Sequence, residues 1–489
     1  MPLSDGHFRA LFEPRGVLVA GVSTHPGKFG FVSLHNILAA GYEGAVHGTS
    51  REAGEVLGVP IVGDVAEVPD DAVDLVFVCT PAAANVDLLR ACAKKGIKAA
   101  FIASAGYGEA GPEGQAMQAE LVALAEDLGM LVAGPNGQGV VSTPVRLCAQ
   151  IVAPYPPAGR IGIASQSGNF VSSFLNYAVQ TGVGVSRAVS AGNAAAVTIP
   201  DYLEWYVRDP ATEVALAYVE GVPEGRRFFE RVRGVAAELP LVLVKGGATA
   251  GGQRAAASHT GSLASDDRVF DGMCRQAGIT RAATIESAYE VAATFATQPL
   301  PKGNRVVVMT TAGGWGVVTA DALNRSSLDL VPLPDDLRAA LDEKLPPRWS
   351  RNNPIDLAGG ETRDTIPEVL ELVVGHPEVD AVIYLGIGIQ SNQATLMRGG
   401  PFYPDHGLGR IVDYHERQDA RFAEAAAELS ERYGKPVLTA TELAVTHPGN
   451  AGPAAVRASG RVCYPSSNRA VVALDHLWRR ARHLSARAG

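Results

Sequence analysis

The sequence has few cysteines and no long apolar run, and both absences limit what the protein can be. Its five cysteines, at positions 79, 92, 148, 274 and 463 of 489 residues, include no CxxC pair. Neither a disulfide framework nor a cysteine-based zinc site is therefore indicated, and we expect a reducing, cytoplasmic setting. No stretch of about 20 apolar residues occurs, and residues 1–16 lack the basic-then-apolar order of a signal peptide, so the sequence predicts neither membrane insertion nor export.

An excess of positive charge is also missing. The net charge is −9 and the isoelectric point is near 5.7, which makes nucleic acid and anionic membrane surfaces poor candidate partners. An anionic ligand must then be bound by groups within its own site and not by the charge of the whole surface. With 47% hydrophobic and 19% charged residues, the composition is that of a globular enzyme, and the length predicts two to four domains.

Short strand-like runs alternate with amphipathic helical stretches along the whole chain, a pattern typical of parallel sheets covered by helices. We predict an α/β protein with three such sheets, in domains at 1–150, 158–298 and 303–489. Proline-rich segments at 153–159 and 298–304 are the predicted linkers, and 391–420 is predicted to be an insertion or surface helix. The predicted strands cover residues 16–22, 44–50, 73–80, 97–104, 129–135, 160–165, 184–192, 213–221, 239–247, 305–314, 379–388 and 435–441.

A glycine-spaced loop follows the first predicted strand. The sequence "GVSTHPGKFG" places Gly21, Gly27 and Gly30 ahead of a helix, but the spacing is not GxGxxG, and the second strand ends in "HGTSR" without an acidic residue. An NAD-type site is therefore disfavoured. Lys28 and Arg51 at strand ends can instead meet phosphate groups of another nucleotide ligand, although a purely structural turn is the competing interpretation.

Two further strand–turn–helix units can bind anions. "IGIASQSGNF" passes through Ser165, Gln166, Ser167, Gly168 and Asn169 into a helix, and "VVVMTTAGGWG" repeats the plan with Gly313, Gly314 and Trp315. Small residues at a helix N-terminus let an anion approach unpaired backbone amides. Neither unit contains GK[ST], so a Walker A loop is excluded.

A histidine lies in a loop of small residues between these two units. "AASHTGSLAS" surrounds His259 with Gly, Ala, Ser and Thr, as a surface loop would. Ser265 is the predicted cap of the next helix, whose apolar positions Val269, Met273 and Ala277 precede Gly278. An imidazole that attacks phosphorus needs room and an acidic partner, and Glu220, at the end of "EVALAYVEG", is the candidate. An exposed loop histidine and a merely solvated glutamate are the competing interpretations.

Several motifs together resemble a known family. "SQSGNF", "YVEG", "SHTGSLA", "QPLPKGNR", "TAGGWGV" and "RNNPIDL" occur in order along nearly the whole chain. They look like the α-type chain of nucleoside-diphosphate-forming acyl-CoA synthetases, of which ADP-forming acetate–CoA ligase is the usual example and succinyl-CoA synthetase a distant relative. "SHTGSLA" after "KGG" is the most specific element, and 391–420 is the least familiar part.

The resemblance implies a Rossmann-like CoA-binding domain followed by two flavodoxin-like succinyl-CoA-ligase domains. It makes His259 the phosphorylated residue and Glu220 its stabilising carboxylate, with the helices at Ser167 and Gly313 directed at the phosphate. It implies ligase activity that needs ADP or ATP with Mg²⁺ on an ATP-grasp β-type partner chain, hence a hetero-oligomer, with a small carboxylic acid and CoA as substrates. The implied CoA-site residues are Gly21, Ser23, Gly27, Lys28, Gly30, Arg51, Thr80, Pro81, Ser104, Ala105, Gly106 and Asn136.

The sequence departs from the family pattern at a few positions. Thr311 and Trp315 stand where "TNAGGPG" is common, "GPNG" continues with "QG" in place of "GPNCLG", and Arg51 replaces a lysine. No ATP-grasp-like domain is found. The bulky Trp315 motivates one alternative, a catalytically reduced CoA-binding protein that regulates or scaffolds a partner. A nicotinamide-dependent oxidoreductase is the other, and it depends on the first sheet alone.

Overall fold

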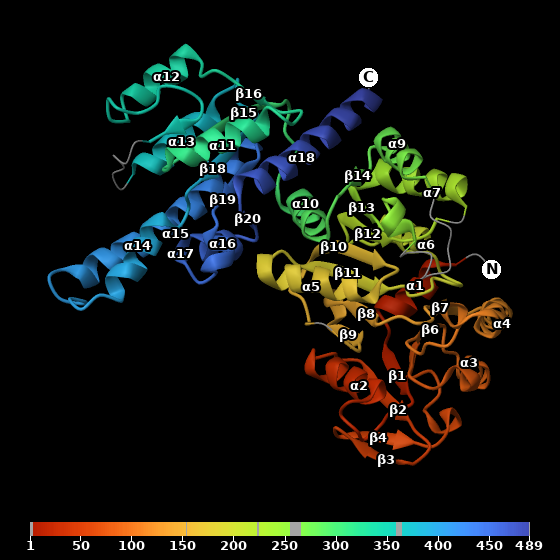
Figure 1. Cartoon of the computed structure of the whole chain (residues 1–489). Coiled ribbons are helices and arrows are strands. Elements are labelled where there is room, and N and C mark those ends of the chain that lie inside the picture. The colour runs from red at the N-terminus through yellow and green to blue at the C-terminus, as the bar shows by residue number, and fades with distance from the viewer. Residues whose placement is uncertain (1–2, 153, 223, 255–265, 358–363, 489) are drawn as a thin grey trace. The chain divides into compact units, whose positions relative to one another are not determined.

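The computed structural model describes residues 3–152, 154–222, 224–254, 266–357 and 364–488, and its elements are shown in Figure 1. The described residues form two compact units, Met1–Gln180 with Gly184–Tyr289, and Thr181–Val183 with Glu290–Gly489. The division falls within the helix α10 (Ile285–Thr297), ahead of the proline-containing segment 298–304 that the sequence suggests as a linker. His259 and the rest of 255–265 lie outside the described residues.

The first sheet has the strand order β3-β4-β2-β1-β5-β6-β7, with every pairing parallel except β3 with β4. Alternate residues of β1 pack on opposite faces: Val17 and Val19 join one hydrophobic cluster, and Leu18 and Ala20 join another. Burial on both faces explains why the strand reads as a continuous apolar run. The strands are β1 (Gly16–Ala20), β2 (Ala45–Thr49), β3 (Gly54–Val56), β4 (Val59–Val62), β5 (Leu75–Val78), β6 (Ala99–Ile102) and β7 (Leu131–Ala133), and the helices are α1 (Asp5–Phe12), α2 (Phe29–Ala39), α3 (Asn85–Lys94) and α4 (Pro112–Leu128).

The second sheet belongs to the same compact unit and has the order β14-β13-β12-β10-β11-β8-β9. Its last two strands form a hairpin from 139–150, a segment that the sequence suggests as the end of the first domain, and β8 pairs antiparallel with β11. The strands are β8 (Gly139–Ser142), β9 (Leu147–Gln150), β10 (Ala158–Ser165), β11 (Val185–Ser190), β12 (Val214–Val219), β13 (Leu241–Lys245) and β14 (Thr280–Arg281), with helices α5 (Gly168–Thr181), α6 (Ile199–Tyr206), α7 (Gly225–Glu238) and α9 (Asp267–Ala277).

A shared core joins the two sheets of this unit. Phe12 of α1 stacks on Trp205 of α6 with ring centroids 4.9 Å apart. Arg187 of β11, which is 1% exposed, pairs with Asp209 at 3.0 Å and also contacts Glu13. The N-terminal helix is therefore held against the second domain by aromatic packing and by the ion pair between its C-cap, Glu13, and Arg187.

Helix α9 differs from the prediction in two details. It buries Phe270 and Cys274 in place of the predicted Val269 and Met273, and Val269 is 70% exposed, whereas Ala277 is buried as predicted. Phe270 faces the core because it packs against Phe228 of α7, at 6.4 Å between ring centroids. The cap is Asp266, which accepts a hydrogen bond from the Arg268 amide, and not the predicted Ser265. Gly278 ends the helix in the left-handed conformation, as predicted.

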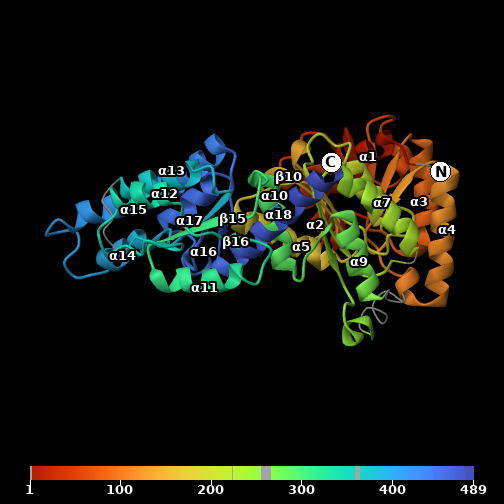
Figure 2. The ribbon, with the colours of Figure 1, turned by 90° about the horizontal axis from the view of Figure 1, so that it is seen from above.

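The third sheet lies in the second unit and has the order β16-β15-β18-β19-β20, with β17 paired to β15. The segment 391–420 consists of most of α14, a turn at 399–407 and the first half of α15, and Figures 1 and 2 both show α14 lying beside α15. The strands are β15 (Arg305–Thr310), β16 (Asp329–Leu330), β17 (Ile355–Asp356), β18 (Ala381–Leu385), β19 (Val437–Ala440) and β20 (Cys463–Tyr464), and the helices are α11 (Gly313–Leu323), α12 (Asp335–Asp342), α13 (Thr365–Gly375), α14 (Ile389–Arg398), α15 (Leu408–Tyr433), α16 (Leu443–Thr446), α17 (Ala451–Ala458) and α18 (Ser467–Ala488). The predicted α/β fold with three mostly parallel sheets is confirmed. Among the described residues, no helix is long and apolar enough to cross a membrane.

Candidate active site

The residues that the resemblance assigns to CoA follow the carboxyl ends of neighbouring parallel strands in the first sheet. The order β2-β1-β5-β6-β7 brings these ends to one edge of the sheet, which is where open α/β sheets bind ligands. β1 leads to Gly21, Ser23, Gly27, Lys28 and Gly30; β2 leads to Arg51; β5 to Thr80 and Pro81; β6 to Ser104, Ala105 and Gly106; and β7 to Asn136.

The glycine loop after β1 folds tightly onto the start of α2. Gly21 has a φ of +86°, and a Cβ atom on Gly30 would lie 2.1 Å from the Gly21 carbonyl oxygen. Only glycine fits at position 30 in this arrangement. Lys28, an exposed residue, is the N-cap of α2, and Arg51 is exposed after β2. The loop, the helix N-terminus and these cations have the properties required to hold the phosphate groups of CoA.

A buried asparagine connects two of these strand ends. Asn85, fully buried at the start of α3, accepts a hydrogen bond from Thr80 Oγ1 at 2.7 Å. Its amide nitrogen donates to Ser104 Oγ at 3.0 Å and to Tyr107 Oη at 2.7 Å. Burial is the main cause that raises the pKa of Tyr107 above its ordinary value, and the bond from Asn85 partly opposes it. Sequence reasoning missed Asn85, because an asparagine at a helix start is ordinarily a cap.

A second asparagine connects the CoA edge to the second domain. Asn193, just after β11, accepts a bond from Asn136 Nδ2 at 3.3 Å and donates to Glu109 at 2.5 Å and to Gln118 at 2.9 Å. Burial acts to raise the pKa of Glu109, but hydrogen bonds from Asn193 and from the Gly106 amide outweigh it and leave the pKa below its ordinary value. Asn193 was also missed, although its place at a strand's carboxyl end was a usable signal.

The predicted phosphate turn of the second domain lies beside Glu220. Ser165 Oγ accepts from the Ser167 amide at 3.1 Å and donates to the Ser167 carbonyl at 2.7 Å, which closes the turn before α5. The Gln166 side-chain oxygen accepts from the Glu220 amide at 2.6 Å. The two predicted elements, the turn and the carboxylate, are therefore adjacent.

Glu220 is buried, with 7% of its surface exposed. Tyr218 lies near it, and burial together with the Glu220 carboxylate raises the pKa of Tyr218. A Cβ atom on Gly246 would come within 2.5 Å of the Tyr218 hydroxyl and 3.3 Å of Glu220 Cγ. The chain that leaves β13 towards His259 thus passes directly beside Glu220. His259 itself falls in 255–265, outside the described residues.

Gln138 occupies the N-terminus of α5. Its side-chain nitrogen donates to Asn169 Oδ1 at 3.0 Å, and its oxygen accepts from Ser172 Oγ at 3.2 Å. A Cβ atom on Gly168 would lie 2.4 Å from the Gln138 side chain. Gln138 is one of the two residues, with Gly137, at which "GPNGQG" departs from the family pattern, so part of the departure falls at the predicted anion cradle.

The third sheet repeats the geometry of the phosphate turn. Thr310 Oγ1 accepts from the Ala312 amide at 3.0 Å and donates to the Ala312 carbonyl at 2.9 Å, as Ser165 does with Ser167. Gly313, Gly314 and Trp315 form the first turn of α11. A Cβ atom on Gly313 would lie 2.5 Å from an oxygen of Asp356, a carboxylate at this cradle that sequence reasoning missed.

Three family models match the chain in sequence order: a CoA binding domain at residues 15–143, a succinyl-CoA ligase like flavodoxin domain at 158–295, and a ligase-CoA domain at 306–389. Together with the fold, they define the class, a CoA-binding protein of the succinyl-CoA-ligase type. The matches cover the two turns and the Glu220 strand.

Curated relatives narrow the class to a family. The α subunit of acetate–CoA ligase (ADP-forming) I from Pyrococcus furiosus is 35% identical over 380 residues, covering 77% of this chain and 82% of that protein. The corresponding isozyme II subunit is 36% identical, covering 76% and 80%. The chain belongs to the α-subunit family of ADP-forming acetate–CoA ligases, which are acyl-CoA ligases, and the predicted family is confirmed.

Solved structures agree over nearly the full length. A dinucleotide-forming acetyl-coenzyme A synthetase 1 from Candidatus Korarchaeum cryptofilum, in complex with phosphate and ADP, has a TM-score of 0.82 at 29% identity and covers 98% of both chains. PH0766 from Pyrococcus horikoshii OT3 gives 0.82 at 27% identity, covering 98% of this chain and 99% of that one. The chain is therefore similar over nearly its whole length to these two solved structures.

Proposed function

We propose that this chain is the acyl-transferring and phosphoryl-carrying subunit of a nucleoside-diphosphate-forming acyl-CoA synthetase. The overall reaction converts acyl-CoA, phosphate and ADP into a carboxylic acid, CoA and ATP, and each step is reversible. CoA supplies the thioester and leaves as the free thiol. The residues of this chain bind the CoA phosphates, hold inorganic phosphate and move the phosphoryl group.

The proposed reaction has three steps. A phosphate oxygen attacks the thioester carbonyl, the carbon–sulfur bond breaks, and the thiolate takes up a proton to leave as CoA, giving an acyl phosphate. A nitrogen of His259 then attacks phosphorus, the bond to the carboxylate oxygen breaks, and the acid departs. Finally ADP attacks the phosphohistidine, which restores free His259 and forms ATP.

The observation that carries the proposal is the adjacency of Glu220 to the Ser165–Gly168 turn. A buried carboxylate beside the path to His259 can hold an imidazole ring and stabilise its cationic, phosphorylated form. The amides at the N-terminus of α5, after the turn closed by Ser165, can bind an anion, and Gln166 links this turn to Glu220 by a hydrogen bond. The turn at Thr310 in the second unit has the same hydrogen-bond pattern.

The nucleotide requires a partner in this proposal. The Pyrococcus relatives are named as α subunits, and the chain spans 54% of the longer acetate–CoA ligase (ADP-forming) I of Archaeoglobus fulgidus. Both facts support an ATP-grasp β-type chain that binds ADP or ATP with Mg²⁺, and a hetero-oligomer as the working enzyme.

The test is a single-turnover thiol measurement on the purified chain. Wild type mixed with acetyl-CoA or a panel of acyl-CoAs should release about one equivalent of thiol only when phosphate is present, and an ATP-grasp partner with ADP should turn this burst into steady release. Glu220→Gln should keep the phosphate-dependent burst and slow the steady release with partner and ADP roughly a hundredfold, because Glu220 acts on His259 after the thiol has left. A burst of equal size without phosphate contradicts the proposal.

The second candidate is a CoA-binding regulatory or scaffolding protein with reduced catalysis. Asp356 beside Gly313 is the observation that favours it, because a carboxylate opposes phosphate binding at that helix N-terminus. Tight CoA binding with no phosphate-dependent thiol release, even with the partner present, is the outcome that selects it.

A further inference from the structure

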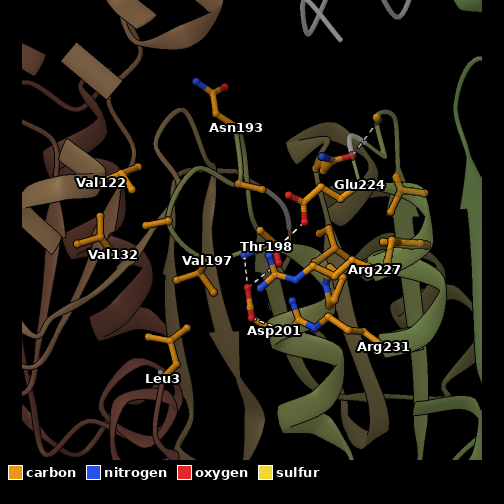
Figure 3. Close-up of a pocket in the computed structure, with 18 of the residues that line it drawn as sticks. Leu3, Val122, Val132, Asn193, Val197, Thr198, Asp201, Glu224, Arg227 and Arg231 are labelled. Carbon is orange, nitrogen blue, oxygen red and sulfur yellow. Dashed lines mark hydrogen bonds and ion pairs between the residues drawn. The ribbon is translucent and has the colours of Figure 1, made fainter. Parts of the chain in front are cut away.

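We propose that the cavity between α4, β7 and the segment 193–201 receives the acyl group, and that it fits a monocarboxylic acyl group with an apolar body larger than acetyl. This inference depends on the proposed acyl-CoA synthetase function and adds the substrate class. The cavity has a volume of about 660 Å³ and lies wholly within the first compact unit. Figure 3 shows Val122 and Val132 on one side of it and Arg227 and Arg231 on the other. Sites of this size hold ligands much larger than an acetyl group.

The cavity lies between the proposed CoA site and the proposed phosphate site, and the acyl carbon must react at both. Gln166 and Gly221, which line it, flank Glu220 and belong to the phosphate side. Asn193, also in the lining, is hydrogen-bonded to Asn136 and Glu109 at the CoA edge. The acyl carbon is bonded to the CoA sulfur before the first step and to a phosphate oxygen after it. Its substituent must therefore extend into space reached from both sites.

Part of the lining suits an apolar body. It is formed by Val122, Met130, Val132 and Val197, of which the last three are at most 3% exposed. Removing an apolar chain from water against such a wall is favourable in proportion to the area buried.

Both arginines in the described lining already have carboxylate partners. Arg231 contacts Asp201 and Glu204, each at 2.6 Å, and Arg227 pairs with Glu224 at 3.1 Å. A second carboxylate on the acyl group would compete with these partners and would be repelled by Glu126, Asp201 and Glu224, which also line the cavity. The lining therefore favours a monocarboxylic acyl group over a dicarboxylic one.

The experiment measures binding of CoA, acetyl-CoA and hexanoyl-CoA to the full chain by calorimetry. Wild type should bind hexanoyl-CoA at least about tenfold more tightly than acetyl-CoA, from the added apolar burial. Val122→Trp, which fills the cavity from α4, should remove this preference and leave CoA affinity unchanged. Ala123→Trp is the matched control, because Ala123 is exposed on the same helix and does not line the cavity; it should behave as wild type.

Ala196→Phe fills the cavity from the segment 193–201 and replaces Val122→Trp if that protein does not fold. A wild type that binds CoA without any preference for hexanoyl-CoA overturns the proposal. So does a preference that survives both substitutions. Failure of wild type to bind CoA is a separate result: it overturns the proposed function and the acyl site with it, whereas normal CoA binding with unaltered acyl preference overturns the acyl site alone.

Discussion

Replacing Asn85 with alanine should weaken both the first domain and its CoA site. The side chain is fully buried and makes three hydrogen bonds, to Thr80, Ser104 and Tyr107. At about 1 kcal/mol for each bond, the free energy of unfolding should fall by about 3 kcal/mol. Because Thr80 and Ser104 follow two neighbouring strands of the CoA edge, releasing them should also raise the dissociation constant for CoA roughly tenfold.

Denaturant unfolding and calorimetric titration with CoA measure the two effects on one preparation. Asn176→Ala is the control, since Asn176 is exposed on α5 and its amide nitrogen donates to a backbone carbonyl of its own helix; its unfolding free energy should change by less than about 0.5 kcal/mol. A loss below about 1 kcal/mol for Asn85→Ala would refute the hydrogen-bond reasoning. A full loss of stability with unchanged CoA affinity would refute the assignment of Thr80 and Ser104 to the CoA site.

Further predictions concern the buried ion pair, the glycine loop and the partly buried His476. Arg187→Met should lower the free energy of unfolding by about 3–5 kcal/mol because it leaves the buried Asp209 without its ion-pair partner. In denaturant unfolding, the double variant with Asp209→Leu should lose less stability than the sum of the two single losses, and strict additivity would contradict the pairing. In the same assay, Gly30→Ala should lower the free energy of unfolding by roughly 1–3 kcal/mol because its Cβ atom clashes with the Gly21 carbonyl. Gly234→Ala, in open space on α7, should raise the free energy of unfolding by about 0.5–1 kcal/mol. Equal effects of the two substitutions would refute the close approach of Gly30 to Gly21. Burial, with a smaller contribution from Arg479, lowers the pKa of His476 to about 4 and outweighs the opposing effect of Asp475. The unfolded chain then binds the proton at higher pH than the folded one, so the free energy of unfolding should fall by roughly 3 kcal/mol as the pH drops from about 6.5 to 4. Thermal unfolding of His476→Gln and of wild type across this pH range measures the effect. If the stability of the two proteins depends on pH in the same way, this role of His476 is contradicted.

The elements that could be predicted from sequence are those with a strong local signal. The runs at 16–22, 73–80 and 305–314 are strands because they are apolar without alternation, as strands buried on both faces must be. The hairpin 139–150 could not be assigned to the second sheet, because its pairing with β11 is a long-range contact that leaves no local pattern. The apolar face of α9 was predicted wrongly for a related reason. Phe270 is buried because it packs against Phe228 of α7, a contact between segments far apart in the sequence.

The same distinction between local and long-range signals applies to the residues of the candidate site. Glu220 and the Ser165 turn could be found because strand ends of a parallel sheet meet at one edge. Asn85, Gln138 and Asn193 could not be assigned from their types, since each acts by bridging segments far apart in the sequence. Asp356 could not be placed beside Gly313 until β17 was seen to pair with β15.

The proposed function requires that the chain carry a phosphoryl group on His259. The most direct test incubates the purified chain with radiolabelled phosphate and acyl-CoA and measures acid-labile label on the protein. Label is expected on wild type and not on His259→Ala, and wild type should lose the label when ADP and an ATP-grasp partner are added. Equal label on His259→Ala, or no label on wild type with any acyl-CoA tested, would contradict this role of His259.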